Sequence, residues 1–314
     1  MKLFFSLLFA TVFISSQATT WDEPWQDKIV KTSQSFVLAK VISCDQAKGV
    51  RIKIIKLLAG LTVPDSVIIN QFSLLHLCSY AADEPPSYRF SNIDSCYFFL
   101  TQNDSAGYSM ATPTSGFAVL YNGMVSATYR HSYHQASVEA GLYEKTMSAI
   151  FQHYHNLAFD TAYINRFVDE QLKLKPAGFG KDEIQTFFKQ HVALELIFHL
   201  QLPQKYELIL PFLNVENFHS QASAARALTW YNTAGAHSQL IAVIANDKTK
   251  DFVKVMAVWA LRQQHPADIK QQLTGLSKTA NDNSDGFGGN IMDPRVCTDV
   301  PSVKKALNEL INSL

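Results

Sequence analysis

The feature that most constrains this fold is a change in hydrophobic period near residue 140. Before it, apolar and polar residues alternate: in "GVRIKIIKLL", Val50, Ile52 and Ile54 alternate with Arg51 and Lys53. Such alternation is typical of a strand with one buried face. Further short apolar runs, separated by turn residues, continue to about residue 130. Short strands at this spacing predict an antiparallel barrel or sandwich.

One pair of these runs carries a strong hairpin signal. Asn122-Gly123 lies between "GFAVLY" and "MVSATYR". Asparagine and glycine accept the positive φ angles that tight hairpin turns require. The sequence therefore predicts a β-hairpin at this point.

After residue 140 the apolar residues recur at helical spacing. Tyr143, Met147, Ile150, Phe151 and Tyr154 fall on one face of a helix. We expect this helix to pack against the barrel or to bridge to the second half of the chain. From residue 182 onward, the pattern predicts one helix after another.

Two of the later helices share a pattern of small residues. The corresponding positions are Ala224 with Ala257, Ala227 with Ala260, and Leu228 with Leu261. Alanine at this spacing lets neighbouring helices approach closely, as stacked helix pairs require. Residues 183–314 thereby resemble a HEAT-like repeat array, whose second helices often read "VR..AA.AL". The resemblance implies a protein-binding surface, although some such arrays support an enzyme domain and a few bind small ligands.

The strands of the first half resemble a second family. The segments "FVLAKVIS", "VRIKIIKLLAG", "VPDSVIINQFSLLHLCSY" and "SCYFFL" are similar to the OB-fold barrel of the netrin/tissue-inhibitor-of-metalloproteinase superfamily, over about 37–100. That family inhibits proteases through a Cys-x-Cys at the mature N-terminus. This chain has "TTWDEPWQDK" there instead. The resemblance therefore implies a fold and argues against metalloprotease inhibition.

Together these patterns predict an α+β multidomain protein, a small antiparallel OB-like β-barrel followed by an α-helical HEAT-like solenoid. The expected parts are a signal peptide (1–18), the barrel domain (19–138), a bridging helix and linker (139–181) and the helical repeat domain (182–314).

The first residues have the order of a secretory signal. In "MKLFFSLLFATVFISSQATTW", Lys2 precedes an apolar block, and small residues follow up to Ala18. The block is shorter than the roughly 20 residues that a bilayer span needs. We expect cleavage near Ala18 and a secreted or periplasmic protein without a membrane span, the alternative being an uncleaved anchor.

Four cysteines make disulfides plausible in an exported chain. A Cys78–Cys96 bridge would close about 18 residues and stabilise by about 3 kcal/mol. A Cys44–Cys297 bridge would join the two predicted domains. The remaining alternative is that the cysteines are buried thiols that act as small apolar side chains.

The loop before the last helix contains a candidate calcium site. Asn281, Asn283 and Asp285 stand at alternate positions before Gly286, as at the opening of an EF-hand loop. Position twelve is Met292 rather than glutamate, so any affinity for calcium should be low. The alternatives are a structural cap, with Asp299 or Ser302 beginning the last helix, or a partner-binding loop.

Four histidines also lie close together in the sequence: His131, His134, His153 and His155. A metal site is one interpretation. However, His131 and His134, three apart on a strand, would point to opposite faces. His153 and His155, two apart on a helix, would not be neighbours. We therefore favour solvated or interfacial histidines.

No GxSxG, P-loop, Rossmann glycine run, CxxC or HExxH motif occurs. Basic and acidic residues number 27 each, so a neutral chain is not expected to bind nucleic acid. The sequence favours a secreted, non-catalytic binding protein whose helical surface and barrel loops contact a protein or peptide partner. A calcium-stabilised extracytoplasmic module and an unrecognised hydrolase are the alternatives. No cofactor other than calcium is expected.

Overall fold

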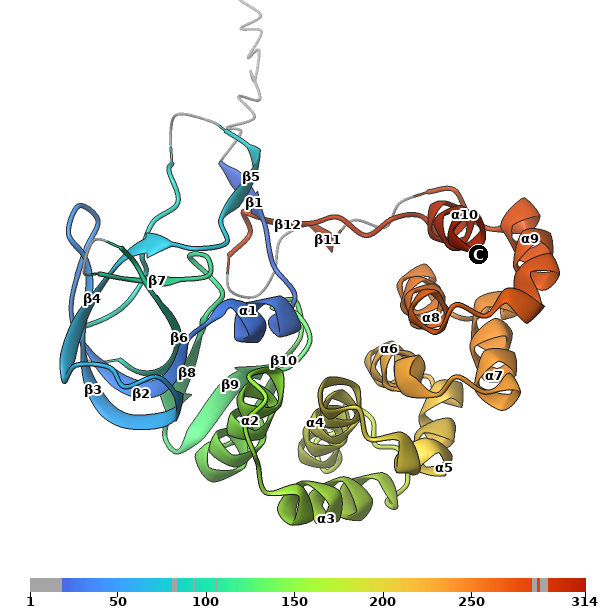
Figure 1. The fold of residues 1–314 in the computed structure, drawn as a ribbon, viewed down its shortest axis with the longest axis horizontal. Helices are drawn as coiled ribbons and strands as arrows, with labels where there is room; N and C mark the ends of the chain where they lie inside the picture. Colours follow the sequence, from blue (N-terminus) through green and yellow to red (C-terminus); the bar gives the residue numbers. More distant parts are fainter. Residues whose placement is uncertain (1–18, 81–83, 93, 105–106, 284–286, 289–292) are drawn as a thin grey trace, which may run out of the picture.

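The computed structural model describes residues 19–80, 84–92, 94–104, 107–283, 287–288 and 293–314. A β-barrel comes first along the chain, and a helical region follows it in an arc (Figure 1). The predicted α+β order, a barrel before helices, is confirmed. The predicted signal peptide lies outside the described residues. Among the described helices, none is both long enough and apolar enough to cross a membrane.

Five strands close the barrel. They are β2 (Ser35–Asp45), β3 (Gly49–Gly60), β4 (Ser66–Phe72), β6 (Ser95–Gln102) and β7 (Tyr108–Met110). Their order around the barrel is β2, β3, β4, β7, β6, and β6 pairs again with β2. Five strands are the number found in an OB-fold barrel.

The barrel is mixed rather than purely antiparallel. β4 and β7 run parallel, whereas the other pairs around the barrel are antiparallel. The expectation of an antiparallel barrel is therefore wrong at this one pair. The cause is the closure itself: β7 turns back along β6 and so arrives beside β4 in the same direction as β4.

Strand β2 contributes to two separate cores. Val37, Ala39 and Val41 are fully buried in the barrel interior. Phe36 belongs to the core beneath the helices, where its ring stacks on Phe99 with centroids 4.7 Å apart. Because both faces are buried only in the first part of β2, its apolar run is continuous from Phe36 to Ala39, and Lys40 and Ile42 beyond it are exposed.

Three further strands extend the sheet from β6 towards the helices: β8 (Phe117–Tyr121), β9 (Met124–Thr128) and β10 (Gln135–Glu139). Asn122 and Gly123 join β8 to β9 with φ angles of 49° and 76°. The predicted hairpin is therefore confirmed, and β10 leads directly into the first long helix.

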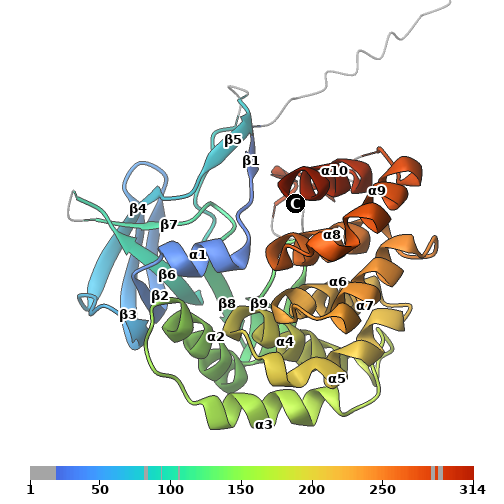
Figure 2. The same cartoon turned by 45° about the vertical axis from the view of Figure 1, so that its right-hand side comes forward.

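The helices stack in two layers (Figures 1 and 2). Their bounds are α1 (Gln26–Thr32), α2 (Ala140–Tyr154), α3 (Thr161–Leu172), α4 (Ile184–Leu200), α5 (Tyr206–Ile209), α6 (Phe218–Ala227), α7 (Ala234–Ala245), α8 (Asp251–Gln264), α9 (Lys270–Thr279) and α10 (Val303–Ser313). Short 3₁₀ helices lie at η1 (Pro203–Lys205), η2 (Leu210–Asn214), η3 (Leu228–Trp230) and η4 (Ala267–Ile269). Helices α4, α6, α8 and α10 pack successively on the inner side of the arc, with α3, α5, α7 and α9 outside them.

The repeated alanines lie where two inner helices meet. Ala224 and Ala227 on α6, and Ala257 and Ala260 on α8, are all buried, and α6 packs against α8. The predicted face of α2 is confirmed for Tyr143, Met147, Ile150 and Phe151, which are buried on the side that packs against the barrel sheet and α4, whereas Tyr154 is half-buried.

The segment between α9 and α10, residues 281–302, returns to the barrel. Its strand β12 (Val296–Thr298) pairs in parallel with β1 (Thr20–Asp22). Strand β1 also pairs with β5 (His76–Ser79), and β11 (Phe287–Gly288) pairs with β12. We call the described residues of this segment, 281–283, 287–288 and 293–302, the strap, because its strand β12 pairs with the first strand of the chain (Figure 1).

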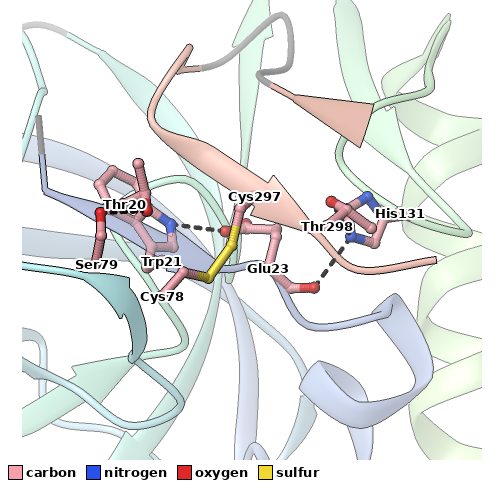
Figure 3. Close-up of a disulfide and its surroundings, with 8 residues drawn as sticks. All are labelled: Thr20, Trp21, Glu23, Cys78, Ser79, His131, Cys297 and Thr298. Atoms are coloured by element: carbon pink, nitrogen blue, oxygen red, sulfur yellow. Dashed lines mark hydrogen bonds between the residues drawn. A yellow bond between two sulfur atoms is a disulfide. The ribbon is translucent and has the colours of Figure 1, made fainter. Parts of the chain in front are cut away.

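A disulfide joins Cys78 of β5 to Cys297 of the strap (Figure 3). The predicted Cys78–Cys96 bridge is therefore wrong, as is Cys44–Cys297. Cys96 is free and fully buried in the barrel interior, while β5 lies outside the barrel in the small sheet with β1. Cys44 is a half-buried free thiol.

Candidate functional site

An open groove of about 700 Å³ lies on the inner side of the arc. Helix α1 and the end of α2 form one wall, and α4, α6, η3 and α8 form the other. Its lining residues are Trp25, Asp27, Lys31, His153, Tyr154, Asn156, Phe198, Gln201, Arg226, Thr229, Trp230, Met256, Trp259, Ala260 and Gln263. A cleft of this volume is in the range of small-ligand sites. We call it the aromatic groove.

Three of the four tryptophans in the chain line the aromatic groove. Trp25 immediately precedes α1, Trp230 ends η3, and Trp259 lies on α8. All three are half-buried, whereas the fourth, Trp21, is fully buried. Half-exposed tryptophans are characteristic of binding surfaces, because they offer a large apolar area at little cost in side-chain entropy.

Arg226 contacts one ring from each of two aromatic pairs in this groove. Its guanidinium carbon is 3.8 Å from the ring centroid of Phe198 and 5.1 Å from that of Trp25. Phe198 adjoins Trp230 at 6.3 Å between centroids, and Trp25 adjoins Trp259 at 5.6 Å. Cation–π contact holds the guanidinium plane in place.

The charge of Arg226 is partly balanced by the buried carboxylate of Glu195. Its Nε donates to Oε2 of Glu195 at 3.3 Å. Glu195 also lies 3.7 Å from Nη1 of Arg130. Both Glu195 and Arg130 are fully buried, so one buried carboxylate faces two guanidinium groups. An ion pair taken out of water is tolerated only with good geometry and further hydrogen bonds.

Asp27 on the opposite wall is ionised beside these cations. Burial alone would raise the pKa of Asp27, but Arg226, His199 and Lys31 together hold that pKa below its ordinary value. Lys31 pairs with Asp27 at 3.0 Å, and its ammonium also lies 4.7 Å from the ring of Tyr154. The groove therefore combines aromatic walls with a few fixed charges.

Beneath the groove, polar residues from distant parts of the chain form a buried cluster. We call it the junction cluster; it contains Arg130, His134, His191, Glu195, His219 and Ser223. Ser223 accepts from Nη1 of Arg130 at 2.9 Å and donates to Glu195 at 2.7 Å, while its oxygen lies 3.0 Å from Nδ1 of His191. These are the residue types of a hydrolase, but Ser223 is fully buried and its proton is directed to Glu195. The arrangement is that of a structural network.

The structure places His131 and His134 differently from the sequence prediction. They lie in a turn between β9 and β10, closed by the N–H of His134 donating to the carbonyl of His131 at 3.0 Å, and not on opposite faces of a strand. Both are buried. Burial lowers the pKa of His131 to about 4 and that of His134 well below its ordinary value.

The predicted histidine group does not come together as a metal site. His134 instead contacts His191 and His219, each at 4.3 Å between ring centroids. His153 and His155 are half-buried, and a ring nitrogen of His155 lies 3.1 Å from the carbonyl of Val30. In the described part of the chain, no three His, Cys, Asp or Glu residues are arranged to hold a metal ion.

A second buried carboxyl, Glu23, lies near the disulfide (Figure 3). It accepts from Nε1 of Trp21 at 2.9 Å, from the Thr112 hydroxyl at 3.1 Å and from the Ser115 hydroxyl. Burial raises the pKa of Glu23 to about 7, although these hydrogen bonds oppose the shift. The Glu23 carbonyl also lies 3.0 Å from Nε2 of His131, which connects this carboxyl to the turn that carries the junction cluster.

The candidate calcium residues are only partly described. The amide oxygen of Asn281 accepts from the backbone N–H of Asn283 at 3.0 Å, and its Nδ2 donates to Asp251 at 2.5 Å. Asp285 lies outside the described residues, so calcium binding stays a prediction. Ser302 accepts from the N–H of Lys305 at 3.1 Å and begins α10, as the cap interpretation predicts.

The sequence prediction did not single out the groove residues. Arg226 and the three tryptophans lie on four separate elements, and nothing in their spacing shows that they converge. A usable signal was present in composition, because the chain has only four tryptophans and tryptophan is enriched at interfaces.

Comparison with protein-family models, with curated proteins and with solved structures finds no match to this chain.

Proposed function

We propose that this chain is an exported, non-catalytic binding protein and that the aromatic groove receives a peptide segment of its partner. The single observation that carries the proposal is the convergence of Trp25, Trp230 and Trp259 on one open groove. Binding energy in protein interfaces is concentrated in such aromatic and arginine side chains. A surface of this kind is rare on a protein without a partner.

Two further features support the proposal. The Cys78–Cys297 disulfide suits an oxidising compartment outside the cytoplasm, in agreement with the predicted signal peptide. The stacked helices present a concave inner side, as repeat arrays do when they bind extended partners. The closed five-stranded barrel and the stacked helix pairs are also what the netrin-like and HEAT-like resemblances imply.

The test uses intrinsic fluorescence, because the groove contains its own tryptophan probes. Capped pentapeptides with two phenylalanines on either side of a varied central residue are titrated into the full mature protein. We expect saturable binding that is weakened about tenfold by Trp259→Leu or Trp230→Leu. Calorimetry repeats the titration for these variants, which have lost part of the optical signal.

The matched control is Tyr121→Ala, which removes an exposed aromatic side chain at the tip of the β8–β9 hairpin. This variant should bind like the wild type. The proposal would be wrong if no peptide bound. It would also be wrong if both tryptophan variants bound the peptides as tightly as the wild type does.

A further inference from the structure

The aromatic lining of the groove includes one buried cation, Arg226, whose hydrogen-bond donors are not all used. Arg226 is only 7% exposed, yet the only hydrogen bond it makes with the described residues is the one from Nε to Glu195. Its Nη2 is buried without a hydrogen-bond partner. An unpaired donor on a buried cation is costly, because losing a hydrogen bond to a charged group costs more free energy than losing one to a neutral group.

The surrounding charges leave the site with an excess of positive charge. Arg130, Arg226 and Lys31 are cationic, whereas Glu195 and Asp27 are the anionic groups in contact with them. The neighbouring His199, which packs beside Tyr154, has its pKa lowered by burial and therefore adds no charge near neutral pH. One further anion would balance the site.

From these observations we infer that Arg226 receives a carboxylate from the bound peptide, and that this carboxylate belongs to an acidic side chain flanked on both sides by aromatic or large apolar residues. The inference rests on the proposed function of the groove and names its ligand. Guanidinium groups bind carboxylates through two parallel N–H donors, and only Nε of Arg226 is already used.

The position of Arg226 favours an internal acidic residue over a chain terminus. The guanidinium contacts two separate aromatic pairs, Phe198 with Trp230 and Trp25 with Trp259. We expect a peptide whose carboxylate meets Arg226 to contact both pairs only if its chain continues in both directions. A terminal carboxylate would leave one aromatic pair without a contact.

The experiment compares three peptide probes on the full mature protein by calorimetry; all are capped at the N-terminus, and the first two are also capped at the C-terminus. The first has glutamate between two phenylalanines, the second has glutamine at the same place, and the third ends in a free carboxylate after its phenylalanines. We expect the glutamate peptide to bind about tenfold or more tightly than each of the others. In Arg226→Lys, which keeps the charge but loses the planar donors, this ratio should fall towards one.

Two variants control the result. Arg262→Lys makes the same substitution at an exposed arginine of α8 that pairs with Glu309 outside the groove, and it should leave the ratio unchanged. Asp27→Asn removes the competing carboxylate of the groove wall, so it should increase the affinity for the glutamate peptide and leave the affinity for the glutamine peptide unchanged. This second variant tests the charge argument even if Arg226→Lys does not fold.

The outcomes separate the two proposals. Equal affinity for the glutamate and glutamine peptides, or tighter binding of the terminal acid, overturns the inference about Arg226 and leaves the groove as a peptide site. Failure of all three peptides to bind overturns the proposed function and the inference together. If the glutamate peptide still binds about tenfold more tightly than the glutamine peptide in Arg226→Lys, another cation binds the carboxylate, and this result also overturns the inference.

Discussion

The interior of the barrel and the junction between barrel and helices are both buried, but they are built from different chemistry. The barrel interior is lined by apolar residues of the closed sheet, with the thiol of Cys96 among them. The junction contains Arg130, Glu195 and several histidines alongside its apolar residues. Stability in the barrel follows buried apolar area, whereas stability at the junction also depends on charge pairing and protonation.

This difference bears on function, because the aromatic groove is at the edge of the junction. Arg226 is shared between the groove and the buried carboxylate of Glu195. If the proposed ligand binds Arg226, it would therefore contact the same network that joins the barrel turn to the helices. Among the described residues of the barrel interior, none shares a hydrogen bond or an ion pair with Arg226.

The largest expected effect is acid sensitivity of the junction. Five histidines there have pKa values lowered mainly by burial: His131, His134, His191, His199 and His219. The folded chain keeps them neutral, while the unfolded chain protonates them near pH 6.5. Their contribution is thus present above pH 6.5 and is lost as pH falls below it, by up to about 1.4 kcal/mol per histidine and pH unit.

Urea unfolding followed by circular dichroism at pH 7.5, 6.5 and 5.5 measures this effect. We expect the free energy of unfolding to drop by several kcal/mol over this range, since the histidines act in the same direction. Midpoints that stay constant down to pH 5.5 would show that the histidines are not held neutral in the folded protein.

The next largest effect is expected from Glu195→Ala. This change leaves Arg130 and Arg226 buried without their shared carboxylate and Ser223 without its acceptor, so we expect a loss of about 3–5 kcal/mol at pH 7.5. Glu207→Ala, at an exposed position on α5, is the control and should change stability by no more than about 0.5 kcal/mol. Denaturant titration measures both. Equal losses would contradict the role given to Glu195.

Breaking the disulfide tests how firmly the strap joins the two regions. The double variant Cys78→Ser/Cys297→Ser should lose about 2–4 kcal/mol, because the bridge restricts the unfolded chain over a long loop. Cys44→Ser, at a free half-buried thiol, is the control and should melt close to the wild type. Thiol titration of the denatured, unreduced protein should find only the two free thiols, Cys44 and Cys96. Four reactive thiols would show that the bridge does not form.

The two regions also differ in how well the sequence predicted them. Alternation in "GVRIKIIKLL" and the Asn122-Gly123 turn are local signals, and both led to the observed strands. The alanines shared by α6 and α8 likewise predicted close helix packing. Such patterns repeat at the period of one element, so neighbouring residues are enough to recognise them.

The junction could not be predicted in this way. Arg130, His191 and Ser223 meet because the turn after β9 packs against both α4 and α6, and no local period encodes that contact. The prediction of the disulfide failed for the same reason. Cys96 is near Cys78 in sequence but is buried in the barrel interior, whereas the strap brings Cys297 to β5 from the far end of the chain.

Glu23 has a pH dependence opposite to that of the buried histidines, and Glu23→Gln should remove it. Burial raises the pKa of Glu23 to about 7 from 4.5, so the folded chain holds a proton that the unfolded chain has released. The contribution of Glu23 is complete below about pH 4.5 and is lost as pH rises through about 7, amounting to at most about 3 kcal/mol. Relative to the wild type, the glutamine variant should gain stability between pH 5 and pH 8. The histidine effects cancel in this difference, and a difference independent of pH would contradict the raised pKa.

The smallest effect is expected in the barrel interior. Ile52→Val removes one methylene from a fully buried residue of β3, so we expect a loss of about 0.5–1.5 kcal/mol. Because this core owes its stability to buried apolar area, the loss should be the same at pH 7.5 and at pH 6.5, where the junction has begun to weaken. Denaturant titration at the two pH values measures it. A loss that changes with pH would mean that the stability of the barrel interior is coupled to the protonation of the junction. The two regions would then differ in their residues but not in how their stability depends on pH.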